Sequence, residues 1–124
     1  MNNEIEVGDF VRLKQGYIGT VENINDFREP SMKYAVDIQK RDLVFVGDDD
    51  IVKHSKSKID IVECSDYVNG SKVLEIMEDM NTGEIHLEMT SNYTNQEIGD
   101  CTIYDKDIKT IVTKEQYKSV EYVF

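Results

Sequence analysis

Hydrophobic and polar positions alternate along most of this chain. Residues 5–13, 32–38 and 84–90 place an apolar side chain at about every second position, the pattern of a strand with one buried face. Tight turns are indicated at Gly16, at Asn69 with Gly70, and at residues 80–83. The pattern predicts short strands over residues 5–13, 17–24, 32–38, 43–46, 51–52, 59–62, 67–68, 72–79, 84–90, 101–104, 108–112 and 120–124.

Composition supports a sheet protein. The 124 residues include 13 valines, 13 isoleucines and a single alanine, Ala35. β-Branched residues favour strands, and alanine is the best helix former. We therefore expect an all-β chain with at most short helical turns.

Two stretches of the chain repeat at a fixed spacing. Asp9-Phe10-Val11 recurs 57 residues later as Asp66-Tyr67-Val68, and residues 46–51 recur at the same offset as residues 103–108. We interpret this as a diverged duplication with modules at residues 1–59 and 60–124. Phe10 and Tyr67 are expected at equivalent buried positions. A module of this size buries only about 60% of its unfolded surface, so the modules are expected to pack on each other.

The opening of the first module resembles that of a known family. Val7-Gly8-Asp9-Phe10-Val11-Arg12-Leu13, followed by Gly16, Gly19 and Val21, is similar to the first strands of KOW-type SH3-like barrels. The second module keeps Asp66-Tyr67-Val68 and Val73, with Ser65 in the place of the glycine. The resemblance implies two tandem five-stranded barrels, a closure that removes exposed sheet edges. The composition also resembles that of small phage and prophage proteins of AT-rich bacteria.

Charge is distributed unevenly between the modules. The net charge is −11, and residues 60–124 hold 14 acids against 5 bases. Residues 73–105 contain no lysine or arginine. Nucleic-acid binding draws most of its affinity from cations on phosphates, so direct binding of nucleic acid by the second module is not expected.

The second module contains a hairpin with an acidic face. Pairing Ile76 with Leu87 and Leu74 with Met89 gathers the apolar residues on one face, provided that the loop at residues 80–83 has an even length. The other face then sets Glu75 opposite Glu88, Met77 opposite His86 and Asp79 opposite Glu84. Directly opposed like charges destabilise a sheet. The face either keeps the protein soluble or binds a basic partner through Glu75, Met77, Asp79, Glu84, His86 and Glu88.

Other candidate sites point to structural roles. Residues 47–50 and 105–107 lack the ligand spacing of a calcium loop and fit turns and caps, so we expect no metal and no cofactor. Cys64 and Cys101 are too few for a disulfide framework. We interpret one basic cluster as a solvated joint between the modules; it consists of Lys53, His54, Lys56 and Lys58. The sequence shows no catalytic nucleophile with a base near it and no cofactor-binding loop, so we do not expect an enzyme.

The expected function is therefore a non-enzymatic protein-binding module. Its acidic face would contact a basic protein surface, such as that of a host nucleic-acid-handling or defence protein if the chain is a phage-encoded inhibitor. One alternative is a KOW-type nucleic-acid or ribosome-associated module using Arg12, Lys14, Lys40 and Arg41. Another is a structural or assembly protein of a phage particle. Lacking a signal-peptide pattern or an apolar run of ~18 residues, the chain is expected in the cytoplasm, that of the host if phage-encoded.

Overall fold

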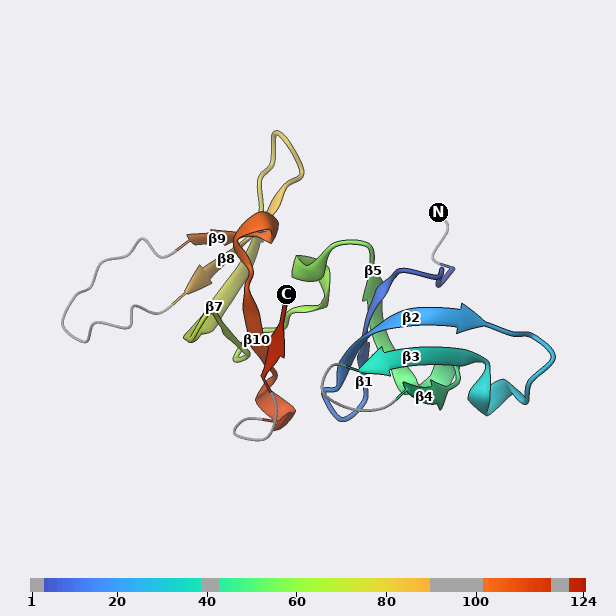
Figure 1. Ribbon diagram of the computed structural model, residues 1–124. Coiled ribbons are helices and arrows are strands. Elements are labelled where there is room, and N and C mark those ends of the chain that lie inside the picture. Colours follow the sequence, from blue (N-terminus) through green and yellow to red (C-terminus); the bar gives the residue numbers. More distant parts are fainter. Residues whose placement is uncertain (1–3, 39–42, 90–101, 117–120) are drawn as a thin grey trace. The chain divides into compact units, whose positions relative to one another are not determined.

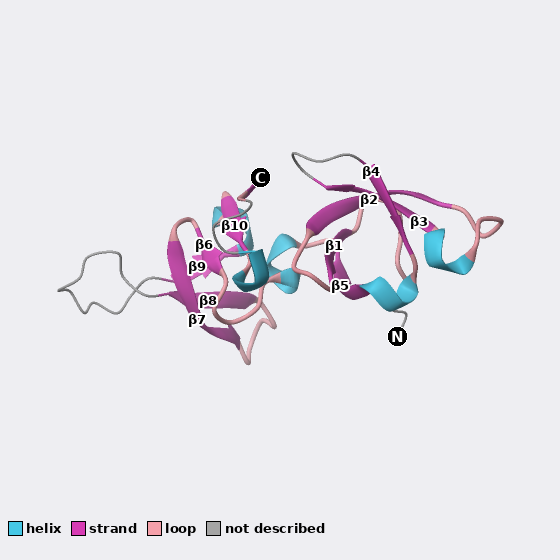
Figure 2. Cartoon of the chain, turned by 90° about the horizontal axis from the view of Figure 1, so that it is seen from below, coloured by secondary structure: helices cyan, strands magenta, loops and turns pink. Residues whose placement is uncertain are grey.

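The computed structural model describes residues 4–38, 43–89, 102–116 and 121–124 and divides into two compact units. Unit 1 comprises residues 1–61 and unit 2 residues 62–124. In Figure 1 unit 1 runs from blue to green and unit 2 from green to red. Throughout the described ranges the helical segments are 3-10 turns of three or four residues (Figure 2). The all-β prediction is confirmed.

Unit 1 is a five-stranded antiparallel sheet in the order β4-β3-β2-β1-β5. Its buried centre is formed by valine and isoleucine, with Val11 and Val36 fully buried. The strands are β1 (Phe10–Leu13), β2 (Ile18–Ile24), β3 (Tyr34–Ile38), β4 (Leu43–Val46) and β5 (Ile51–Ser55). The 3-10 turns are η1 (Pro30–Met32), η2 (Asp48–Asp50) and η3 (Lys58–Ile61).

Unit 2 is a six-stranded antiparallel sheet in the order β11-β10-β6-β7-β8-β9. Its core includes Val68, Leu87, Ile111 and Tyr122, all fully buried. The strands are β6 (Tyr67–Val68), β7 (Ser71–Glu78), β8 (Ile85–Met89), β9 (Thr102–Tyr104), β10 (Thr110–Val112) and β11 (Tyr122–Val123). The 3-10 turns are η4 (Asp105–Asp107) and η5 (Lys114–Gln116). The strand predicted over residues 120–124 is described as β11 at the sheet edge, so this unit has six strands where the family resemblance implies five.

The two units share one strand order. In each, the first strand lies between the second and the fifth, and a 3-10 turn connects the fourth strand to the fifth. Val11 pairs with His54 in unit 1, and Val68 pairs with Ile111 in unit 2, so each pair is related to the other by 57 residues. Phe10 and Tyr67 are also equivalent, but both are only half-buried.

The turn before the first strand is the same in both units. The Asp9 carboxylate accepts a hydrogen bond from the backbone N–H of Glu6 at 3.0 Å, and Asp66 accepts one from Glu63 at 2.8 Å. Gly8 and its counterpart Ser65 both have positive φ, 95° and 80°. Glycine adopts this conformation without strain, so the serine of unit 2 is held in it by the surrounding turn.

The turn between the fourth and fifth strands also recurs at this spacing. Asp50 accepts a hydrogen bond from the N–H of Gly47 at 3.0 Å, and Asp107 accepts one from Tyr104 at 3.2 Å. The prediction that residues 47–50 and 105–107 serve as turns and caps is therefore confirmed. The 57-residue spacing is a repeat of hydrogen-bonded structure as well as of sequence.

Gly19 of β2 is required by a close approach of β3. A Cβ atom at this position would lie 2.7 Å from the carbonyl oxygen of Asp37. A side chain would force the two paired strands apart.

The sheets are open in the described residues. The outer strands β4 and β5 of unit 1 are not paired with each other, and neither are β9 and β11 of unit 2. Closed barrels are therefore not confirmed, and the observed architecture is two open antiparallel sheets. Packing of the two units on each other stays a prediction.

Candidate functional site

The predicted acidic hairpin is formed by β7 and β8 of unit 2. Glu75 lies opposite Glu88, and Met77 lies opposite His86. Across the loop, the N–H of Asp79 donates to the carbonyl oxygen of Glu84 at 2.9 Å. The predicted pairing and the even loop over residues 80–83 are confirmed for these residues, while their role in binding stays a prediction.

One of the predicted pairings in the hairpin is wrong. Val73, not Leu74, lies opposite Met89, because a bulge between Val73 and Glu75 takes Leu74 out of register. Val73 is buried, and its backbone bonds to the preceding turn, with its N–H donating to Asp66 and its carbonyl accepting from Ser65. Leu74 is left 52% exposed.

The third strand of the sheet adds residues that the sequence analysis did not include. In β9, Tyr104 pairs with His86, and Thr102 pairs with Glu88. Directly opposed residues point to the same side of a sheet. We use the name acidic face for the side of β7, β8 and β9 and the adjoining loop that carries Glu75, Met77, Asp79, Glu84, His86, Glu88, Thr102 and Tyr104.

His86 lies beside one carboxylate of the acidic face. Its Nε2 lies 3.1 Å from an oxygen of Glu88, and its ring lies 5.6 Å from that of Tyr104 between centroids. Glu75 lies directly across from Glu88 and is exposed. In the part of the chain that the structure describes, no lysine or arginine forms an ion pair with the carboxylates of this face.

Asp79 also forms hydrogen bonds within the hairpin loop. Its Oδ1 accepts hydrogen bonds from the N–H groups of Asn81 at 2.7 Å and Thr82 at 3.2 Å. The carboxylate therefore caps the loop and adds negative charge at the end of the face. The two roles are compatible because the residue is exposed.

One of the basic residues proposed for the nucleic-acid alternative is buried. Arg12 was expected on the surface, but its side chain is fully buried and donates to the carbonyl oxygen of Ile61 at 3.0 Å. The expectation was wrong because the guanidinium finds its acceptor 49 residues further along the chain. Lys14 is exposed, and Lys40 and Arg41 lie outside the described residues.

The predicted basic joint is partly a structural cluster around Asp9. Lys56 Nζ lies 2.6 Å from Oδ1 of Asp9 and 3.0 Å from Oε1 of Glu6, and His54 Nδ1 lies 3.2 Å from Oδ2 of Asp9. Burial alone would raise the pKa of Asp9, but the hydrogen bonds from Lys56, Glu6 and His54 together hold this pKa below its usual value. The hydrogen bond to Asp9 in turn raises the pKa of Lys56. Lys56 and His54 are thus engaged within unit 1.

Within the described ranges, no group of three or more histidine, cysteine, aspartate or glutamate side chains has the arrangement to hold a metal ion. Nor do those ranges contain a helix with the length and apolar content to cross a membrane.

No protein-family model, curated protein or solved structure matches this chain.

Proposed function

We propose that the protein is a non-enzymatic protein-binding module that contacts a basic partner protein through its acidic face. The observation that carries the proposal is the direct opposition of Glu75 and Glu88 in a region whose carboxylates have no lysine or arginine partner among the described residues. Opposed carboxylates weaken a sheet by about 0.5 kcal/mol. A cation from a partner would relieve this repulsion and stabilise the complex.

An apolar side chain beside the carboxylates supports binding over simple solubilisation. Met77 is 42% exposed on the acidic face, whereas Ile76, opposite Leu87, belongs to the other side of the hairpin. A face that serves only solubility gains nothing from an exposed methionine. Such a side chain would be buried by a partner, while the surrounding carboxylates would guide its approach.

We also propose that each unit is an SH3-like small barrel. The proposal is supported by the shared strand order, with the first strand between the second and the fifth, and by the 3-10 turn before the fifth strand. Gly8 and Gly19, two residues that carry the KOW resemblance, each have a physical reason to be glycine. Such barrels occur in proteins with many unrelated functions, so the fold alone does not identify the function.

The class of partner follows from the chemistry of the face. Carboxylates arranged along a sheet suit a surface of lysine and arginine, such as one that binds nucleic-acid phosphates. A phage-encoded inhibitor of a host nucleic-acid-handling or defence protein would act by occupying such a surface. The nucleic-acid-binding alternative is weakened by the burial of Arg12 and by the net charge of −11.

The test compares two doubly substituted proteins of equal net charge. Glu75→Gln/Glu88→Gln removes the opposed pair, and Glu22→Gln/Glu121→Gln removes two exposed carboxylates elsewhere. Partners captured from lysate on the wild-type protein are purified, and their association rates are measured by stopped flow from low to physiological salt. The wild-type rate should fall as salt rises. The Glu75→Gln/Glu88→Gln protein should associate about tenfold more slowly at low salt, and the control within about twofold of wild type.

Two results would contradict the proposal. One is a Glu75→Gln/Glu88→Gln protein that binds as fast and as tightly as wild type at low salt, which would leave the face a solubilising role. The other is a shift of mixed DNA and RNA by the wild-type protein in a low-salt electrophoretic assay, which would favour the nucleic-acid alternative.

A further inference from the structure

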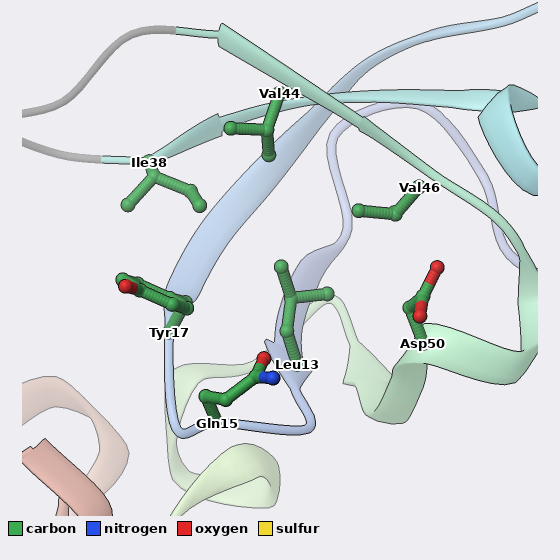
Figure 3. Close-up of a pocket in the computed structure, with 7 residues that line it drawn as sticks. All are labelled: Leu13, Gln15, Tyr17, Ile38, Val44, Val46 and Asp50. Atoms are coloured by element: carbon green, nitrogen blue, oxygen red, sulfur yellow. The ribbon is translucent and has the colours of Figure 1, made fainter.

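Unit 1 contains a pocket that is separate from the acidic face. Its volume is about 320 Å³, and Figure 3 shows its side chains surrounding one space. The wall is mostly apolar, and its polar groups come from Gln15, Tyr17 and Asp50. The lining residues are Leu13, Gln15, Tyr17, Ile38, Val44, Val46 and Asp50.

One side of the pocket is formed by β4, an edge strand. Val44 and Val46 line the pocket, while the alternate residues Leu43 and Phe45 are 47% and 43% exposed. Among the strands that the structure describes, β4 pairs only with β3. An edge strand presents N–H and C=O groups to which another extended chain can pair, and charges or proline normally protect such edges. The described strand, Leu43–Val46, contains neither.

The other face of β4 is partly covered from within unit 1. The guanidinium of Arg28 lies 4.9 Å from the ring centre of Phe45 and donates to the carbonyl oxygens of Met32 and Lys33. Asn23 accepts a third bond from Arg28, so this residue is held in place over Phe45. The pocket side and the outer backbone of β4 are therefore the parts that a ligand would reach.

Charge at the end of β4 indicates what kind of chain would pair with it. Three aspartates, Asp48–Asp50, follow the strand after Gly47. Asp48 accepts from the hydroxyl of Tyr34 at 2.6 Å and Asp50 from the N–H of Gly47, whereas Asp49 is exposed. A second copy of this chain would bring the same aspartates and a net charge of −11, so self-pairing is opposed by repulsion. A basic segment is favoured by attraction.

We propose that β4 binds an extended basic segment of a partner protein as an added strand. One apolar side chain of the segment enters the pocket between Val44 and Leu13, and a lysine or arginine of the segment lies near Asp49. Backbone pairing supplies affinity, and the pocket with its acidic end supplies specificity. This site is on unit 1 and does not depend on the acidic face of unit 2.

The experiment uses the full chain and a defined probe. The probe is a fluorescein-labelled decapeptide of alternating valine and threonine that ends in two lysines, and a matched peptide ends in two glutamates. Fluorescence anisotropy at low salt should show saturable binding of the lysine peptide and much weaker binding of the glutamate peptide. In 1H–15N spectra, the peptide should shift the amides of β4 and slow their hydrogen exchange.

Three substituted proteins locate the site. Asp49→Asn should weaken binding about two- to fivefold, while the control Glu22→Gln, which removes one exposed carboxylate from β2, should leave it unchanged. Val44→Thr keeps the side-chain shape but places a hydroxyl in the pocket, which should weaken binding about three- to tenfold. Its thermal unfolding is compared with wild type to confirm that unit 1 is folded. Glu75→Gln/Glu88→Gln should bind the peptide as wild type does.

Each of the following results would overturn the proposal. The first is no saturable binding of the lysine peptide at millimolar concentration. The second is a set of shifts confined to residues 75–88, with binding lost in Glu75→Gln/Glu88→Gln; this would leave the acidic face as the basic-peptide site. The third is concentration-dependent dimerisation in sedimentation velocity with broadening of the β4 amides, which would identify a second copy as the occupant.

Discussion

Replacing Asp66 with alanine should destabilise unit 2 by about 3 kcal/mol. The side chain is fully buried, and its two oxygens accept hydrogen bonds from the backbone N–H groups of Glu63 at 2.8 Å and Lys114 at 3.0 Å. A hydrogen bond to a charged group contributes about 1.5–3 kcal/mol, and a donor left buried without a partner adds its own penalty. From the turn alone, a sequence-based value would be about 1 kcal/mol, because only one of these two bonds is local.

The matched variant Asp66→Asn separates charge from geometry. An asparagine keeps one acceptor oxygen of similar position but loses the charge and the second acceptor. Its effect should be about half that of alanine, or roughly 1.5 kcal/mol. This milder variant also keeps the test usable if the alanine variant leaves unit 2 unfolded.

The assay must report on each unit separately, since a chain of two units does not have to unfold in one step. In a urea titration followed by 1H–15N spectra, the amides of Val68 and Ile111 report on unit 2, and those of Val11 and Val36 on unit 1. With a urea dependence of about 1–3 kcal/mol per molar, the unit 2 midpoint of the alanine variant should fall by roughly 1–3 M. A loss below about 1 kcal/mol, or equal losses for alanine and asparagine, would refute the reasoning.

Two further predictions concern other polar residues. The lowered pKa of Asp9 implies that its contribution to stability is present above about pH 4, the range of an unfolded aspartate, and is lost as the pH falls through the folded pKa. The urea midpoint of unit 1 should therefore fall more steeply between pH 5 and pH 2.5 in wild type than in Asp9→Asn, and parallel curves would contradict this. Asn69 has a φ of 54°, accepts from the N–H groups of Lys109 and Thr110, and donates to the carbonyl of Asp107. Asn69→Ala should lower the stability of unit 2 by about 2 kcal/mol and Asn69→Gly by less, because glycine tolerates the φ; a glycine variant as unstable as alanine would show that backbone strain is unimportant.

The register of the acidic hairpin was predictable from the sequence because a strand alternates with a period of two. Once Ile76 is paired with Leu87, Glu75 must lie across from Glu88, and an even loop is required. Leu74 does not follow this alternation. The bulge that exposes it depends on Val73, whose backbone bonds to Ser65 and Asp66 come from the turn before β6 and not from the hairpin itself.

Burial of Arg12 in unit 1 was not predictable from the sequence. Arginine is most often exposed, and the alternating pattern around Arg12 gives no sign of an acceptor. Its partner is the carbonyl of Ile61 in η3, which comes near β1 only through the tertiary fold. The same applies to Tyr104, which reaches His86 by pairing of β9 with β8.

The sequence alone determined the all-β class, the 57-residue repeat, the turns at residues 47–50 and 105–107 and the acidic pairs of the hairpin, because each depends on residues near one another in the chain or on a strict alternation. Tertiary structure decided the bulge at Leu74, the burial of Arg12 and the pocket beside β4. The pocket is lined by residues from Leu13 to Asp50 that belong to separate strands and turns. Contacts between distant segments follow from the packing of the whole unit, and local patterns of residues do not predict them.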